Sequence, residues 1–95
     1  MQVSQMCKMV EIWLGHKLFS FRIIGIKPIA NAGYRFFFLE YQGTLIDHID
    51  VYPDGRMINA NGDDIIDIEL SATDGNSEVV NDIALYRDQL QVANM

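Results

Sequence analysis

The chain has 95 residues, of which 49% are apolar, and its 13 acidic and 7 basic side chains give a net charge of −6. A chain of this length fits one domain with a thin core, so we expect a single domain over residues 1–95. Because so many residues are apolar and the core is thin, we expect apolar side chains to remain on the surface after folding. Such a surface favours a homo-oligomer, most simply a dimer.

Cys7 is the only cysteine, which excludes an intrachain disulfide and with it a disulfide-stapled secreted fold. A reducing, cytoplasmic location is therefore expected. The longest apolar runs cover residues 23–26 and 36–39, whereas a membrane-spanning helix needs about 20 apolar residues. We therefore expect no membrane contact.

The two halves of the chain differ in charge. Residues 1–46 carry five basic and two acidic side chains, a net charge of +3, whereas residues 47–95 carry two basic and eleven acidic ones, a net charge of −9. The acidic half would repel phosphate backbones, and it could instead steer a basic protein partner or the basic half of a second copy. The simpler interpretation is that the acids keep an apolar-rich protein dispersed.

Residues 1–7 are expected to form a flexible tail, followed by antiparallel hairpins over residues 9–70. In the first hairpin, residues 9–14 and 17–26 flank Gly15-His16, which suits a type II′ turn. Pro28 then ends the second strand because it has no N–H to donate. Residues 34–41 are rich in aromatic side chains and predict a central strand.

A strand over residues 44–52 follows, and Tyr52-Pro53-Asp54-Gly55 matches a type I turn with a glycine bulge. The chain returns over residues 56–60. Asn61-Gly62 is a strong signal for a type I′ hairpin turn, which leads into a last strand over residues 63–70.

Residues 77–92 predict an amphipathic helix, because apolar side chains recur there at helical spacing, with Asn76 or Ser77 as N-cap. We therefore expect the α+β class. The fold would be an antiparallel β-meander of about five to six strands, as a curved sheet or partly closed barrel, with one C-terminal helix packed on it.

The turn registers sort the side chains of this sheet onto two faces. An almost wholly apolar face, assigned to the core under the helix, collects Phe36, Phe38, Leu45, Ile49, Val51, Met57, Ile66, Ile68 and Leu70. The other face mixes aromatic and charged side chains, as contact surfaces do. Its candidate interface residues are Phe37, Tyr41, His48, Tyr52 and Ile58. Alternatively, the N-terminal hairpin folds across this face and covers it.

No motif predicts catalytic residues, a bound cofactor or a metal. His48 has Asp47 and Asp50 nearby, but Asp47 points to the opposite face of a strand, and no third ligand converges. The aromatic strand at residues 34–38 could be taken for a base-stacking platform. Such platforms need cations around them, and the pairing strand supplies Asp47 and Asp50 instead. Direct nucleic-acid binding is therefore not expected.

The leading functional hypothesis is a non-enzymatic protein-binding or self-associating domain. A second hypothesis is an acidic inhibitor that mimics nucleic acid and occupies a basic cleft, which requires one exposed stripe of Asp47, Asp50, Asp54, Asp63, Asp64 and Asp67. A third is a small-ligand-binding domain, with a void lined by Trp13 and the phenylalanines between the sheet and the N-terminal hairpin.

Overall fold

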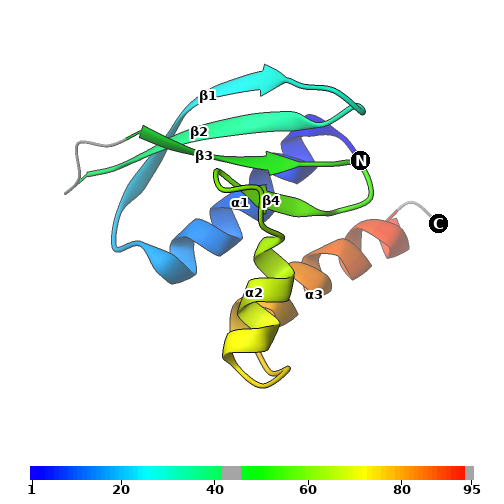
Figure 1. The fold of residues 1–95 in the computed structure, drawn as a ribbon. Helices are drawn as coiled ribbons and strands as arrows, with labels where there is room; N and C mark the ends of the chain where they lie inside the picture. Colours follow the sequence, from blue (N-terminus) through cyan, green and yellow to red (C-terminus); the bar gives the residue numbers. More distant parts are fainter. Residues whose placement is uncertain (42–45, 94–95) are drawn as a thin grey trace.

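The computed structural model describes residues 1–41 and 46–93, and the side chains of residues 1–41 and 46–90. In chain order its elements are α1 (Val3–Lys17), β1 (Phe21–Pro28), β2 (Tyr34–Glu40), β3 (Ile46–Val51), β4 (Met57–Asn59), α2 (Ile65–Ala72) and α3 (Glu78–Ala93) (Figure 1). The α+β class and the antiparallel meander are confirmed, because the four described strands pair in the order β1-β2-β3-β4.

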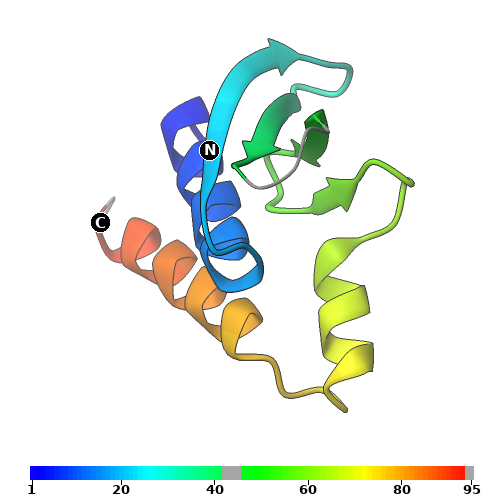
Figure 2. The ribbon, with the colours of Figure 1, turned by 90° about the vertical axis from the view of Figure 1, so that its left-hand side faces the viewer.

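The helices lie mainly to one side of this sheet. Figure 1 shows α1 passing behind β1–β3 with α3 below the sheet, and Figure 2 shows both helices to the same side of the strands, whereas α2 lies beyond β4. The helix α1 contacts both β2 and α3, so α1 covers the sheet and α3 packs largely on α1. Within the described residues, the opposite face of β1–β3 has no helix across it.

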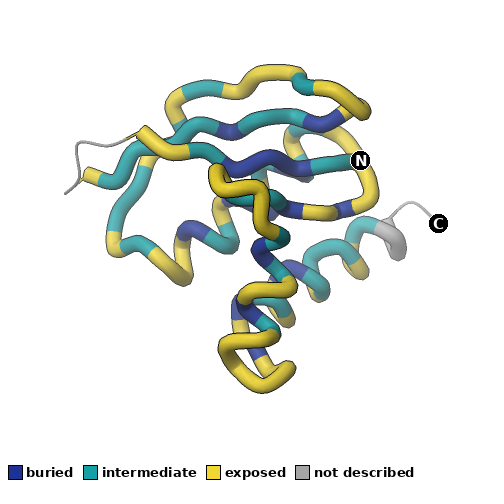
Figure 3. Tube along the Cα trace, in the orientation of Figure 1, coloured by how far each residue is buried: buried dark blue, intermediate teal, exposed yellow. Residues whose placement is uncertain are grey.

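The core lies between α1, α3 and the covered face of the sheet. Phe36, Ile49, Val51 and Met57 are at most 1% exposed, as the predicted inner face requires (Figure 3). They pack with side chains of the helices, which are Met6, Met9, Val10, Leu14, Ile65, Val79 and Ile83. Leu45, also predicted for the core, lies outside the described residues.

The predicted N-terminal hairpin is wrong, because residues 3–17 form the helix α1. Because α1 begins at Val3, residues 3–7 of the tail predicted over residues 1–7 are helical. Met6, Met9, Val10 and Leu14 are buried along one side at helical spacing, and this burial outweighs the turn signal of Gly15-His16. Gly15 lies in the last turn of α1 and does not take the positive φ that a type II′ turn requires.

The predicted strand over residues 63–70 is also wrong. Asn59 ends β4, because its side-chain Oδ1 accepts the backbone N–H groups of Asn61 and Asp63 at 3.0 and 2.9 Å. Asp64 then caps α2, with its carboxylate accepting the N–H of Asp67. The described chain therefore has four strands and three helices, instead of five to six strands and one helix.

The C-terminal helix and one turn are confirmed. α3 covers Glu78–Ala93, and the Ser77 hydroxyl accepts the N–H of Val80 as an N-cap does. In the predicted turn, Gly55 donates to the Tyr52 carbonyl at 2.9 Å and has φ +91°, as a glycine bulge needs. None of the described helices is both long enough and apolar enough to cross a bilayer.

Candidate protein-binding surface

The uncovered side of the sheet, here called the open face, is defined by cross-strand partners. Residues directly opposite each other in a sheet share a face. Three rows result, one along each line of partners. They are Arg22, Leu39 and Ile46; Gly25, Phe37 and His48; and Lys27, Arg35, Asp50 and Ile58.

An ion pair lies in the third row. The Arg35 guanidinium donates from Nε and Nη2 to the two carboxylate oxygens of Asp50, at 2.8 and 3.0 Å. Asp50 is only 7% exposed, so this two-point pairing satisfies a carboxylate that water barely reaches. Hydrogen bonds to Asp50 raise the pKa of Arg35 further above its ordinary value. The pair adds polarity to the open face without adding net charge.

The structure brings three of the five candidate interface residues together on the open face. The rings of Phe37 and His48 meet with their centroids 5.8 Å apart, and Ile58 lies beside Asp50, both as the predicted register requires. The remaining two lie just beyond strand ends. Tyr52 follows β3 and packs against Gly33, and Tyr41 follows β2 and is 61% exposed.

The contact between Tyr52 and Gly33 leaves no room for a side chain at position 33. A Cβ atom placed on Gly33 would lie 2.8 Å from two carbons of the Tyr52 ring. The Arg56 guanidinium stacks on the same ring, 4.9 Å from its centroid. Tyr52 is therefore held in place from two directions.

Sequence reasoning missed the charge of the open face. Arg22, Lys27 and Arg35 against Asp50 give this face a net charge of +2, so the rest of the chain, whose total is −6, carries −8. The pair of Arg35 and Asp50 follows from the predicted register of Phe37 opposite His48. Arg22 and Lys27 could not be found that way, because β1 pairs with β2 and not with residues 9–14.

The described residues hold no group of three or more side chains suited to a metal. Asp47 accepts the N–H of His48 and lies opposite Phe38, away from the open face. Burial, with Glu11 nearby, raises the pKa of the Cys7 thiol. This disfavours the thiolate form that a nucleophilic cysteine needs.

One exposed stripe of all six predicted acidic residues, which an inhibitor of basic clefts requires, does not form, because one of the six is buried. Asp50 is buried and paired with Arg35. Asp54 binds Arg56 in the turn before β4, and Asp64 caps α2. Each of these three carboxylates is therefore oriented by a hydrogen bond or ion pair with a nearby group.

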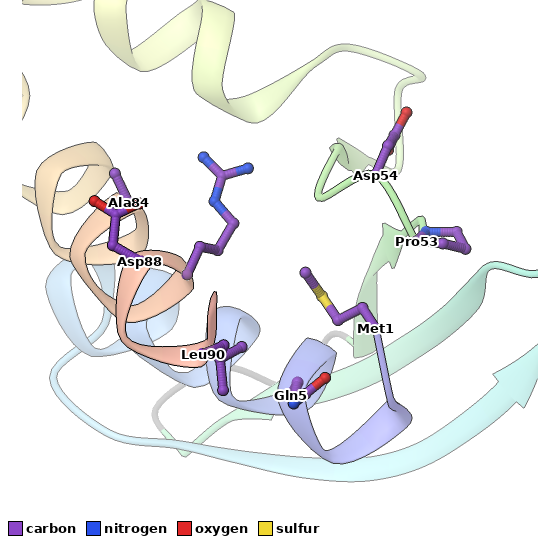
Figure 4. Close-up of a pocket in the computed structure, with 8 residues that line it drawn as sticks. Met1, Gln5, Pro53, Asp54, Ala84, Asp88 and Leu90 are labelled. Atoms are coloured by element: carbon purple, nitrogen blue, oxygen red, sulfur yellow. The ribbon is translucent and has the colours of Figure 1, made fainter. Parts of the chain in front are cut away.

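Two hollows border the helices, and neither is the void predicted between a hairpin and the sheet. One, of about 370 Å³, lies between the start of the chain, the turn at Pro53 and Asp54, and α3 at Ala84 and Asp88 (Figure 4). The other, of about 500 Å³, lies between α1 and α3. Trp13 lines neither of them and packs against the core from α1, with no partner for its indole N–H among the described residues.

Comparisons with protein-family models, curated proteins and solved structures found no match to this chain.

Proposed function

We propose that this chain is a protein-binding domain that associates with a second copy of itself through the open face. The observation that carries the proposal is a sheet face with no described helix across it and with apolar and aromatic side chains at its centre. Such a face in water favours a partner that removes it from solvent.

The centre of the open face has the composition of an interface core. Ile46, the first residue of β3, is 61% exposed, and Leu39, Phe37 and His48 are each half-buried. Burial of apolar area contributes about 25 cal/mol per Å². A second copy supplies the same side chains, so one symmetric contact would bury both sets.

The charges of the open face are compatible with this contact. Arg35 and Asp50 neutralise each other, so covering them leaves no unpaired charge. Arg22 and Lys27 project from β1, the edge strand, and would remain solvated at the rim of the contact.

The test is the mass of the protein in solution at micromolar concentration, measured by light scattering during gel filtration. One chain has a mass of 10.8 kDa, and we expect about twice that value. Ile46→Asp should shift the mass to that of one chain, because it places a charge among the apolar side chains of the open face. Tyr41→Asp, which places a charge just beyond the end of β2, should have the same effect if the contact extends to this exposed side chain.

The matched control is Leu85→Asp on α3, since Leu85 is 59% exposed and Ile46 is 61% exposed. This variant should keep the mass of two chains. A monomer mass for the unmodified protein would refute the proposal, and so would an equal response of Ile46→Asp and Leu85→Asp.

A further inference from the structure

We infer that the free edge of β1 binds an extended acidic segment of another protein, which joins the sheet beside β1 as an additional strand. This inference concerns the edge of the sheet, and it does not depend on association through the open face. It follows from the exposure of β1, its apolar side chains and its charge.

β1 is one of the two edge strands of the sheet and the longer of them. It is eight residues long, whereas β4, at the other edge, has three. Figure 1 shows no other described segment beyond β1, and Figure 3 shows the last residues of β1 exposed. An edge strand presents unpaired N–H and C=O groups, onto which an extended peptide can add.

Apolar side chains along this edge are unusually accessible. Ile24 and Ile26 are 43% and 46% exposed, and Phe19, just before the strand, is 95% exposed. A bulge between Ile23 and Gly25 leaves Ile24 out of the pairing with β2. Charges on an edge strand normally discourage pairing. The two charged side chains of β1 are both basic, so they repel a basic strand and attract an acidic one.

Those two charges are Arg22 and Lys27, which both belong to the open face. Neither forms an ion pair within the described part of the chain, and Arg35 beside them is already paired with Asp50. A second copy aligned antiparallel along the whole of β1 would place Arg22 opposite Lys27, a repulsive contact. An acidic strand would instead place carboxylates opposite both.

The spacing of these carboxylates follows from the pairing of β1 with β2. Arg22 and Lys27 are five residues apart, yet their partners Leu39 and Arg35 are four apart, because the bulge absorbs one residue. A regular strand added at the free edge would likewise have the residues opposite Arg22 and Lys27 four positions apart. The segment should therefore carry acids at positions i and i+4. Apolar residues at i+1 and i+3 would lie beside Ile23 and Ile26.

The experiment uses a synthetic peptide with glutamates four positions apart, valines next to each glutamate on the inner side and threonines elsewhere. Binding is measured by fluorescence anisotropy, and its location by amide chemical shifts of the labelled protein. We expect saturable binding with the largest shifts along β1, weakened by added salt. The same peptide with lysines in place of the glutamates should not bind.

The variant Arg22→Gln/Lys27→Gln should weaken binding of the glutamate peptide about tenfold. Both side chains are exposed, so the fold should tolerate the change. Lys8→Gln, an exposed position on α1, is the control and should bind normally. Ile46→Asp, designed to prevent association through the open face, should also bind normally, so the two proposals fail separately.

Four outcomes would overturn the inference. The first is that the glutamate peptide does not bind. The second is that the lysine peptide binds equally well. The third is that the shifts lie away from β1. The fourth is that Arg22→Gln/Lys27→Gln binds as the unmodified protein does.

Discussion

Individual residues set the geometry of the open face through a few polar contacts. Arg35 and Asp50 are opposite each other on β2 and β3, and their two hydrogen bonds fix both side chains on the face. Tyr52 is fixed in turn by Gly33 and Arg56. Phe37 and His48 pair two positions along the same two strands, next to the Arg35–Asp50 pair on the open face.

The loop between β1 and β2 contains a strained residue. Gly33 donates to the Ala30 carbonyl, and the two residues between them, Asn31 and Ala32, have φ of 63° and 59°. Asparagine tolerates this left-handed region, whereas alanine pays a steric penalty there of about 1–2 kcal/mol. The turn with two positive φ angles thus occurs here, although Asn61-Gly62 had the better sequence for it.

Ala32→Gly should consequently raise the free energy of unfolding by about 0.5–1 kcal/mol, since relief of strain exceeds the entropy cost of glycine. Ala30→Gly is the control, because Ala30 is exposed and lacks a positive φ. It should leave stability unchanged or lower it. Urea unfolding of both variants measures the difference, and a gain no larger for position 32 than for position 30 would contradict the assignment of strain.

Asp54 makes the turn before β4 sensitive to acid. Its carboxylate accepts the backbone N–H and the Nε–H of Arg56, and these hydrogen bonds, the backbone one foremost, lower the pKa of Asp54 from its ordinary value. A lowered carboxyl pKa stabilises the fold above the unfolded pKa. That stabilisation is lost as the pH falls through the folded pKa.

Asp54→Asn should therefore be less stable than the unmodified protein at pH 6, and the gap should narrow as the pH falls below about 4. Urea unfolding across this range gives both curves. A gap that is constant with pH would show that the ionised carboxylate has no part in holding the turn.

Among the elements, α2 depends most on a single capping contact, because it has only eight residues. Isolated helices of that length are unstable, so the cap and the burial of Ile65 and Glu69 must hold it. Asp64 supplies the cap by accepting the N–H of Asp67 at 3.1 Å.

Asp64→Ala should lower the free energy of unfolding by about 1 kcal/mol, the usual value of an N-cap. Asp63→Ala is the matched control, since it removes the neighbouring exposed carboxylate and leaves the cap intact. That control should change stability by less than about 0.5 kcal/mol. Equal losses from the two substitutions would indicate an effect of net charge.

Across the whole molecule, the position of α2 is tied to α1 by an ion pair between Lys17 and Glu69. Lys17 ends α1, and Glu69 is the one buried acid of α2. The Glu69 side chain is 11% exposed and that of Lys17 is 38% exposed, so Glu69 depends on Lys17 more than the reverse.

Lys17→Met should thus destabilise the protein by about 1–3 kcal/mol, because it leaves a nearly buried carboxylate without its partner. The double variant Lys17→Met/Glu69→Leu should recover part of this loss, and Glu69→Leu alone should cost less than Lys17→Met. Chemical unfolding of all three gives the coupling energy. Additive effects would show that the pair does not join α2 to α1.

The sequence by itself determined the features that depend on neighbours close along the chain. These are the turn at Pro53 and Asp54, the helix capped by Ser77, and the register that sets Phe37 opposite His48 and Ile58 opposite Asp50. Turn geometry and helix caps act within a few residues, so their signals are legible in the sequence.

Only the tertiary structure decided whether residues 3–17 and 65–72 are helix or strand. Both segments are rich in apolar side chains that fit either period, and the outcome depends on which side of each segment finds a core to cover. The side chains of α1 cover the inner face of the sheet, which leaves the open face uncovered and β1 at its edge. Arg22 and Lys27 lie on that face because β1 pairs with β2, whereas residues 9–14, the predicted partner of β1, belong to the helix α1.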